Sequence, residues 1–550
     1  MSALRINKKN PPGSTTGPVR KKSEDIMADS WPPDGLVGES GVVDIRLGMF
    51  GPERYRCPAS DALKARGLRP RARASRKPET LEPFLNGPFM AAADVLERPP
   101  HLQEPVVSGS GRRRPVHDGV RQWTEHALRT YRGAFPEDPG LRPARRPWVY
   151  RHPQQTDGAR GTVEYRITAW GRCFESDDGR LRELRLPVNR LRARSAAERA
   201  VAALVAAEGD PDPRLERIRV IQFALHDGGK DTIFLGTRDE ALAVYRKDGA
   251  PAVRALLDSR EYRPGTACTS CAIAPVCPAL PRAAGLLGTA DRSRPRRSWS
   301  STTGRAHRTC PARGYLRGLR LPVAAAVERG AAVERGRAIH AFLAARHSRL
   351  PRTPCTPNIP ADWVPEGYQL PEGERRLGAG LLRHHAEVCP IGAAGPQSQI
   401  RTEPRLVFDD TAADLLVLAE PDVLYQHGGS WVWRETKTSG SDRPRHDVLA
   451  SYPQLALALR IIGSGALPGP RAGGRVELEL LRPGGVDLHT LDPFAPATRQ
   501  TAEAVLREQV SGWHAETLFE PVPGPQCATC EVAGWCSARQ IQEEGPEGKQ

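Results

Sequence analysis

The same cysteine pattern occurs twice in this chain of 550 residues. Cys268–Cys277 read CTSCAIAPVC and Cys527–Cys536 read CATCEVAGWC, so both segments have the spacing C-x2-C-x5-C. Cysteines clustered in this way are typical of metal or cluster ligands in a reducing compartment, where disulfides are rare. Each triple needs a fourth ligand from elsewhere in the chain, and that requirement restricts how the chain can fold.

Other landmarks repeat in the same order before each triple. Cys57 opens CPASDALKARGL and lies 211 residues before Cys268, and Cys310 opens CPARGYLRGL and lies 217 residues before Cys527. A glycine that opens a helix-compatible segment and a hairpin pattern then follow in both halves. Ordered landmarks at matched spacing indicate a duplicated module.

The duplication predicts the domain organisation and the missing ligands. We expect a disordered N-terminal tail, a first module, a linker, a second module and a polar tail, at residues 1–50, 51–285, 286–308, 309–540 and 541–550. The predicted quartets are Cys57 with Cys268, Cys271 and Cys277, and Cys310 with Cys527, Cys530 and Cys536. Four thiolates suit zinc or an iron–sulfur cluster, and we favour one [4Fe–4S] cluster per module because structural zinc sites more often use two close pairs of ligands. The leftover cysteines are expected to be ordinary buried thiols: Cys173, Cys355 and Cys389.

The chain is strongly basic, with a net charge of +16, which points to a polyanionic partner such as nucleic acid. The alternative is that arginine is abundant because the coding sequence is GC-rich. Residues 111–150 hold nine arginines and four acidic residues, and we expect either a DNA-binding segment or a solvated, partly disordered insertion. No apolar run is long enough for a membrane span and no secretory leader is recognisable, so we expect a cytoplasmic protein.

The pattern of residues 414–439 predicts a hairpin that carries two acidic side chains. A Gly-Gly pair at 428–429 is a favoured two-residue loop, because both positions tolerate positive φ. With that loop Asp422 lies opposite Glu435, and Lys437 shares their face two residues further along the strand. Adjacent carboxylates repel each other unless a cation lies between them, so the hairpin suggests a site for Mg²⁺ or Mn²⁺. The alternative is an exposed ribbon of salt bridges.

The segment EPD…ETK (420–437) resembles the signature of the PD-(D/E)xK nuclease superfamily, and its surroundings resemble the RecB-like branch. That branch has an early cysteine, a Gly-x-x-x-His helix, the acidic hairpin, a glutamine-containing helix and a C-terminal cysteine triple. The matching residues of this chain are Cys310, Gly336, His340, Asp422, Glu435, Lys437, Gln454, Cys527, Cys530 and Cys536. For His340 taken alone, an ordinary helix histidine is the alternative.

The resemblance implies a role for each residue. It implies that the metal ligands are His340, Asp422 and Glu435, that Lys437 is the catalytic lysine, and that Gln454 orients the site or the DNA. The branch commonly has a tyrosine four residues after that glutamine, where this chain has Ala458. The fold class it implies is α/β, with tandem modules that each have a mixed central sheet flanked by helices, among them 326–346 and 446–463.

The first module lacks this set of residues. Segments 169–180 and 419–430 align at an offset of 250, which places Arg172 at the position of Asp422. Ala91 replaces the helix histidine, and in RELR (182–185) Arg185 replaces the lysine. We therefore expect the first module to be a degenerate copy that keeps its cysteine quartet.

The expected function is metal-dependent hydrolysis of DNA phosphodiesters, as an exonuclease on ends or single strands. One alternative is a non-catalytic DNA-binding scaffold with two iron–sulfur or zinc staples, and another is an unrelated zinc protein. The chain has no G-x-x-x-x-G-K-[ST] phosphate loop, so a helicase or other motor would have to be a separate partner.

Overall fold

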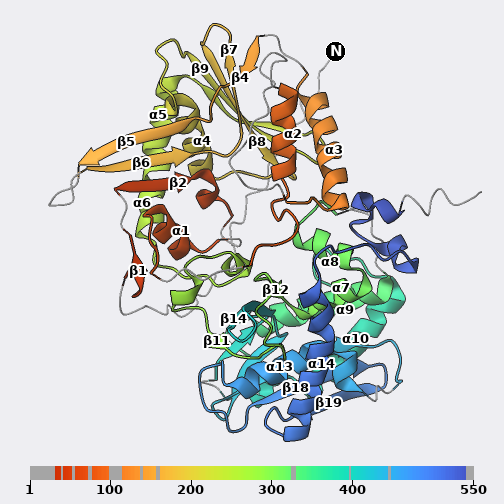
Figure 1. The fold of residues 1–550 in the computed structure, drawn as a ribbon. Coiled ribbons are helices and arrows are strands. Elements are labelled where there is room, and N and C mark those ends of the chain that lie inside the picture. Colours follow the sequence, from red (N-terminus) through yellow and green to blue (C-terminus); the bar gives the residue numbers. More distant parts are fainter. Residues whose placement is uncertain are drawn as a thin grey trace, which may run out of the picture.

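A computed structural model describes most of the chain and contains two α/β modules that follow one another (Figure 1). The described residues are 31–38, 41–52, 56–71, 77–97, 114–136, 140–155, 162–323, 330–395, 398–443 and 447–539. Within them, no helix has the length and apolar character needed to cross a membrane.

The first module is built on a five-stranded sheet with the order β10-β9-β8-β7-β4. Its strands are β4 (Leu141–Pro143), β7 (Arg172–Ser176), β8 (Leu181–Val188), β9 (Arg217–Ala224) and β10 (Lys230–Gly236). Only the β8–β9 pair is parallel. Helix α4 (Ala196–Glu208) packs on one face, and α2 (Gly87–Glu97) and α3 (Asp118–Ala134) lie on the other.

The second module repeats this sheet strand for strand, in the order β13-β16-β17-β18-β19. Its strands are β13 (Ile400–Thr402), β16 (Val423–His427), β17 (Ser430–Thr438), β18 (Arg475–Arg482) and β19 (Gly485–Leu491), and only β17–β18 is parallel. Helices α13 (Pro453–Ser464) and α14 (Pro496–Ala515) cover one face, and α9 (Ala331–His347) and α10 (Glu372–Glu387) cover the other. Matching strand order and direction in both halves confirm the predicted fold class.

The hairpin of β16 and β17 has the predicted loop and register. Gly428 and Gly429 have φ of 57° and 82°, and His427 pairs with Ser430 across them. Positive φ at both loop positions gives a turn whose twist matches that of the strands.

Two small sheets extend the predicted boundaries of the modules. A three-stranded sheet holds β2 (Val42–Arg46), β6 (Thr162–Thr168) and β5 (Val149–Gln155), and a four-stranded sheet holds β11 (Arg282–Ala283), β14 (Leu406–Asp410), β15 (Leu415–Ala419) and β12 (Ser298–Trp299). The predicted tail is therefore wrong over β2, where Val43 and Ile45 are buried, and residues 1–30 lie outside the described part. The predicted linker is also structured, because Leu286, Leu287 and Trp299 pack into the core of the second module.

The remaining elements are short. They are β1 (Leu36–Val37), β3 (Arg69–Pro70), α1 (Pro58–Ala65), α5 (Arg238–Val244), α6 (Ala250–Asp258), α7 (Ser301–Thr309), α8 (Pro311–Gly318), α11 (Pro390–Ala393), α12 (Val448–Ser451), the π-helical turn η4 (Tyr245–Gly249) and the 3-10 turns η1 (Leu47–Phe50), η5 (Thr266–Thr269), η6 (Ala274–Val276), η7 (Pro525–Thr529) and η8 (Ala533–Trp535). The predicted helix 446–463 is divided at Tyr452, because a residue before proline avoids the helical conformation and Pro453 follows. The predicted helix 326–346 begins at Ala331, after residues 324–329, which are not described.

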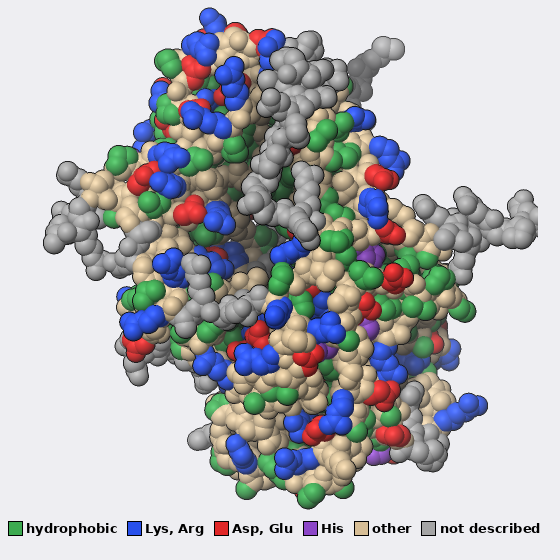
Figure 2. All heavy atoms as spheres, in the orientation of Figure 1, with side chains coloured by type: hydrophobic (Ala, Val, Ile, Leu, Met, Phe, Trp, Pro, Cys, Tyr) green, Lys and Arg blue, Asp and Glu red, His purple; other side chains and the backbone are tan. Residues whose placement is uncertain are grey.

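The modules pack against each other through the C-terminal cysteine segment and α3. The rings of Trp123 and Trp535 meet edge to face, with centroids 4.9 Å apart, in a cluster that includes Val120 and Leu316. The described part of the Arg-rich stretch 111–150 is thus a folded helix and strands rather than a disordered insertion, whereas residues 111–113 and 137–139 are not described. On the face of the molecule drawn in Figure 2, Lys and Arg side chains are spread over the upper and lower halves among acidic side chains. The positive charge on this face is therefore not gathered in a single stripe.

Candidate active site and cysteine clusters

Four of the predicted site residues meet beside the start of β16 in the second module. Lys437 Nζ lies 3.0 Å from Glu435 Oε2 and 3.4 Å from Asp422 Oδ2. His340 Nδ1 on α9 lies 3.1 Å from Asp422 Oδ1. Glu435 is almost fully buried, and the other three are half-buried. The hairpin and α9 together therefore form one compact charged group.

Local geometry explains how these side chains reach one another. The backbone N–H of Thr436 donates to Asp422 Oδ2 at 2.7 Å, which fixes that carboxylate against β17. A Cβ at Gly336 would lie 3.2 Å from Thr438 Oγ1, so the glycine lets α9 approach β17 closely. One turn further along α9 (about 3.6 residues per turn), His340 faces Asp422. The spacing Gly-x-x-x-His thus has a packing reason.

The surroundings shift the pKa values of the two carboxylates in opposite directions. Burial disfavours a charged Asp422, but Lys437 and His340 outweigh burial and hold its pKa well below the usual range. Burial raises the pKa of Glu435, and Lys437 only partly offsets that effect. Burial also disfavours a charged Lys437, yet the two carboxylates hold its pKa above the ordinary value. An additional positive charge at this place would favour the ionised form of Glu435.

An open cavity of about 740 Å³ lies in front of the charged group. Its lining includes three basic side chains from separate segments: Arg305 on α7, Arg320 after α8, and Arg405 before β14. Thr266 of η5 also lines it, so the first module contributes to the wall. A cavity that joins acidic groups to several guanidinium groups suits a phosphate-containing ligand.

Gln454 is placed as predicted, at the start of α13 and in the wall of this cavity. Its Oε1 is buried and accepts no hydrogen bond from the described residues. Ala458, at the position where the RecB-like branch commonly has tyrosine, is buried in the core instead. Tyr452 lines the cavity two residues before Gln454.

The donor set fits a hard divalent cation. Asp422 and Glu435 offer carboxylate oxygens, His340 offers an imidazole nitrogen, and the carbonyl of Thr436 faces the same point, since Lys437 Nζ donates to it at 2.9 Å. The carboxylate and carbonyl oxygens are the ligands that Mg²⁺ and Mn²⁺ prefer, and His340 adds a single nitrogen.

The structure brings each predicted cysteine quartet together. Cys57, Cys268, Cys271 and Cys277 line one cavity, and Cys310, Cys527, Cys530 and Cys536 line another. Backbone N–H groups point at the sulfurs, with Arg263 N 3.3 Å from Cys57 Sγ and Val522 N 3.4 Å from Cys310 Sγ. Such N–H donors stabilise thiolates, which are the form that binds metal.

The cavities that the two quartets line differ in volume. The first cavity measures about 270 Å³ and the second about 20 Å³. A volume of about 20 Å³ holds little more than one water-sized sphere. Both cavities are also lined by residues outside the quartets, such as Tyr262 in the first and Gln526 in the second, so these volumes do not measure the space between the sulfurs.

The structure corrects the prediction for two of the leftover cysteines. Cys355 and Cys389 lie with His347 and His385 in a group whose ligand atoms are all within 4.8 Å of one another. The spacing His385-x3-Cys389 is typical of metal ligands and was the signal in the sequence. By contrast, Cys173 packs beside the core of the first module, where burial raises its pKa to about 11.

The predicted equivalents in the first module are also corrected. Arg172 and Arg185 pair with each other across β7 and β8, but they point to the face covered by α2, where Arg172 binds Glu97 and Asp94. The loop between β7 and β8 is two residues longer than the Gly-Gly loop, so each strand ends one residue further from the centre of the loop. A shift of one residue turns side chains to the other face of the sheet, so residues aligned at a constant offset of 250 lie on opposite faces in the two modules.

Counting from the loop ends of the strands restores the correct faces. Asp422, Glu435 and Lys437 then correspond to Gly171, Leu186 and Val188. Leu186 packs under α4, as Trp433, on the same face of β17 as Glu435, packs under α13.

Comparisons with known proteins agree with the geometry of the second module. Residues 298–537, somewhat less than half of the chain, match the family model of the PD-(D/E)XK nuclease superfamily. The members of that superfamily are generally metal-dependent nucleases, which fits the donor set described above. No curated protein matches the chain.

A solved structure described as "Crystal structure of SSO0001" shares 15% identity with the chain and has a TM-score of 0.17. The match covers 26% of this chain and 61% of that one. A likeness this distant adds nothing to the interpretation of the site.

Proposed function

We propose that the second module is a divalent-metal-dependent deoxyribonuclease of RecB-like type, which cleaves phosphodiester bonds at DNA ends or in single strands. The observation that carries this proposal is the convergence of His340, Asp422, Glu435 and Lys437 at the wall of an arginine-lined cavity. The superfamily match of residues 298–537 supports a nuclease. The preference for ends and single strands rests on the sequence resemblance alone.

Each residue has a definite task in this proposal. His340, Asp422 and Glu435 would hold Mg²⁺ or Mn²⁺, which supplies Lewis-acid activation of water and of the phosphate. Lys437, with a pKa above its ordinary value, remains an ammonium ion and stabilises negative charge that develops on the phosphate. Gln454 offers a free acceptor for the attacking water or a base, because its Oε1 has no partner among the described residues.

Substrate binding would use the basic wall of the cavity. Arg305, Arg320 and Arg405 lie on the sides of the cavity, where they can contact successive phosphates of one strand. Thr266 of the first module also lines the cavity, which supports a contact between the first module and the same strand. We infer that the first module is a degenerate copy that helps to shape the binding site, and that both quartets hold a metal cofactor, either a [4Fe–4S] cluster or zinc.

The proposal implies that the protein acts on DNA in the cytoplasm, where thiols stay reduced. Processive action on duplex DNA would require a motor from a separate helicase.

The test is cleavage of end-labelled single-stranded DNA by the full-length protein with Mg²⁺ or Mn²⁺. We expect degradation that EDTA abolishes and that the Asp422→Ala/Lys437→Ala double variant loses by about 100-fold or more. Asp487→Asn is the matched control, because Asp487 is an exposed carboxylate on β19 of the same sheet and pairs only with Arg482 among the described residues. Cleavage that persists in the double variant would contradict the proposal.

The alternative, a non-catalytic DNA-binding scaffold, has one supporting observation. Lys437 lies within 3.4 Å of both carboxylates and partly neutralises them without any added ion. A scaffold would bind DNA equally well with EDTA and would not cleave it with any divalent ion.

A further inference from the structure

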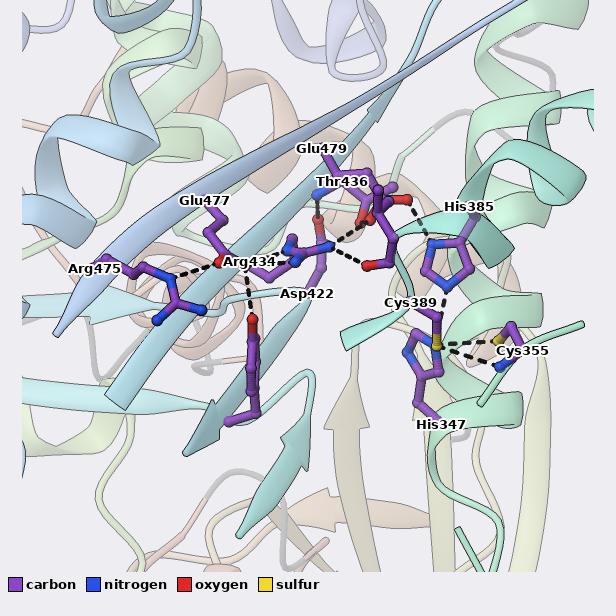
Figure 3. Close-up of polar contacts among 12 residues, drawn as sticks. His347, Cys355, His385, Cys389, Asp422, Arg434, Thr436, Arg475, Glu477 and Glu479 are labelled. Atoms are coloured by element: carbon purple, nitrogen blue, oxygen red, sulfur yellow. Dashed lines mark hydrogen bonds and ion pairs between the residues drawn. The ribbon is translucent and has the colours of Figure 1, made fainter. Parts of the chain in front are cut away.

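A further cluster of side chains that can bind a metal lies in the second module, on the opposite side of the sheet from the cavity of the candidate active site. His347 ends α9, Cys355 follows in the next loop, His385 lies in the last turn of α10, and Cys389 directly precedes α11. Figure 3 shows these four side chains pointing toward a common centre. They come from two segments of the chain, 347–355 and 385–389, which the fold brings together.

The three separations between His347 Nε2 and the other ligand atoms match those of a tetrahedral zinc site. Zinc with two nitrogens at about 2.0–2.1 Å and two thiolates at about 2.3 Å separates its ligands by about 3.3 Å for N–N and about 3.6 Å for N–S. The Nε2 atoms of His347 and His385 lie 3.2 Å apart. His347 Nε2 lies 3.5 Å from Cys355 Sγ and 3.7 Å from Cys389 Sγ. Each measured separation is within about 0.2 Å of its tetrahedral value.

Hydrogen bonds alone account poorly for this packing. Three hydrogen-bonding atoms surround His347 Nε2, namely His385 Nε2 and the two sulfurs, yet a ring nitrogen donates or accepts only one good hydrogen bond. The other ring nitrogen, His347 Nδ1, is buried without a partner among the residues that the structure describes. A cation at the common centre would use all four lone pairs at once.

The surroundings orient the ligands as metal sites usually require. Nδ1 of His385 lies 2.6 Å from Glu479 Oε1, which directs Nε2 of that ring toward the centre of the cluster. Glu479 also accepts from Thr436 Oγ1 at 3.2 Å. A carboxylate behind a ligating histidine fixes its tautomer and strengthens it as a ligand. The backbone N–H of Cys355 donates to Cys389 Sγ at 3.3 Å, which stabilises the thiolate.

We propose that His347, Cys355, His385 and Cys389 bind one zinc ion in a closed, tetrahedral Cys₂His₂ site. Three of the four residues are buried and all four positions are filled by protein, so the site is structural rather than catalytic. Thiolate and imidazole ligands favour zinc over Mg²⁺ and Mn²⁺, which bind oxygen. The site is separate from both cysteine quartets and does not depend on the proposed nuclease activity.

This zinc would stabilise the framework that holds the candidate active site. It joins the end of α9, the helix that carries His340, to α10 and α11. Through His385 and Glu479 it also supports Thr436, which lies between Glu435 and Lys437 on β17. Loss of the metal is therefore expected to loosen α9 against β17.

Metal analysis of the full-length protein tests the proposal. Zinc and iron per chain are measured for the wild type, for Cys355→Ser/Cys389→Ser, and for Cys173→Ser as the matched control, a thiol packed beside an apolar core. We expect the double variant to lose one zinc per chain with unchanged iron, and the control to lose neither metal. Equal zinc in the wild type and the double variant would overturn the site.

A second measurement covers a double variant that does not fold. The wild-type chain is loaded with cadmium, whose NMR shift differs between a site of two sulfurs and two nitrogens and a site of four sulfurs. We expect a signal of the mixed type. A spectrum with four-sulfur signals alone, or a Cys355–Cys389 disulfide detected by thiol alkylation and mass spectrometry, would contradict the proposal.

Discussion

The two modules fold the same sheet but differ in what they place on one of its faces. Where the second module has its carboxylates and lysine, the first has Gly171, Leu186 and Val188. Leu186 is buried in the core under α4. The sheet therefore does not need the charged residues in order to form, and their presence in the second module calls for a function.

Buried glutamates show the same difference. Glu198 on α4 binds Arg192 and Arg194 and accepts from the backbone N–H of Ser195, and these partners lower its pKa in spite of burial. Glu435 has only Lys437 and the indole N–H of Trp433, and its pKa is raised. A carboxylate with complete partners stabilises a fold, whereas one with incomplete partners is suited to bind a ligand.

The largest effect is expected from the residue that completes each quartet. Cys57→Ser and Cys310→Ser each remove a link that closes a loop of more than 200 residues, and we expect a loss of about 5 kcal/mol in the stability of that module. Iron and zinc analysis together with thermal unfolding measures this. We expect each variant to lose the metal of its own quartet. Unchanged metal content in both variants would show that the quartets are not metal sites.

A mirrored pair of substitutions tests the different roles of one sheet position. We expect Glu435→Ala to reduce DNA cleavage by about 100-fold while the module stays folded. Leu186→Ala should leave cleavage within about threefold but lower the free energy of unfolding by about 3 kcal/mol, because it creates a cavity in a packed core. Rates on labelled DNA and urea denaturation give both values. The reverse result, a stability effect from Glu435 and a catalytic effect from Leu186, would exclude our correspondence of the two modules.

The third prediction concerns Glu198 and its pH dependence. Glu198→Gln leaves Arg192 and Arg194 without their anion, and we expect a loss of about 3 kcal/mol at pH 7. Since the folded pKa is below the unfolded value of about 4.3, the stabilisation is complete above that value. It is lost as the pH falls through the folded pKa, so wild type and variant should converge in strong acid. Urea denaturation of both proteins at a series of pH values measures this difference in unfolding free energy. A difference that stays constant with pH would show that the charge of Glu198 is irrelevant.

The smallest effects are expected for single arginines. Arg305→Ala and Arg405→Ala should each weaken DNA binding by about tenfold and lower the salt slope by about one. Arg129→Ala and Arg132→Ala, at exposed positions on α3, serve as matched controls and should change affinity by less than twofold. Equal losses in both pairs would show that the first module binds DNA as strongly as the cavity does.

Much of the site was predictable because it depends on short-range rules. The Gly-Gly loop sets the register, so the sequence places Asp422 opposite Glu435, and the paired cysteine segments indicate both quartets. The face of β8 was not predictable by a constant offset, since two extra loop residues reverse it.

Other features depend on tertiary packing and leave only a partial trace in the sequence, such as the spacing His385-x3-Cys389. The metal-ligating group of His347 and Cys355 with His385 and Cys389 forms only because α9 and α10 pack together. The strand β2 follows a polar, Pro/Gly-rich stretch at the start of the sequence, and it pairs with β6, over 100 residues away.

Metal binding at the hairpin is the most direct test of the central claim. Mn²⁺ binding to the full-length protein is measured by electron paramagnetic resonance, for the wild type and for Asp422→Asn/Glu435→Gln, after zinc and iron contents are shown to be equal. We predict that the wild type binds Mn²⁺ and that the double variant loses this binding. Equal Mn²⁺ binding by both proteins would contradict the account.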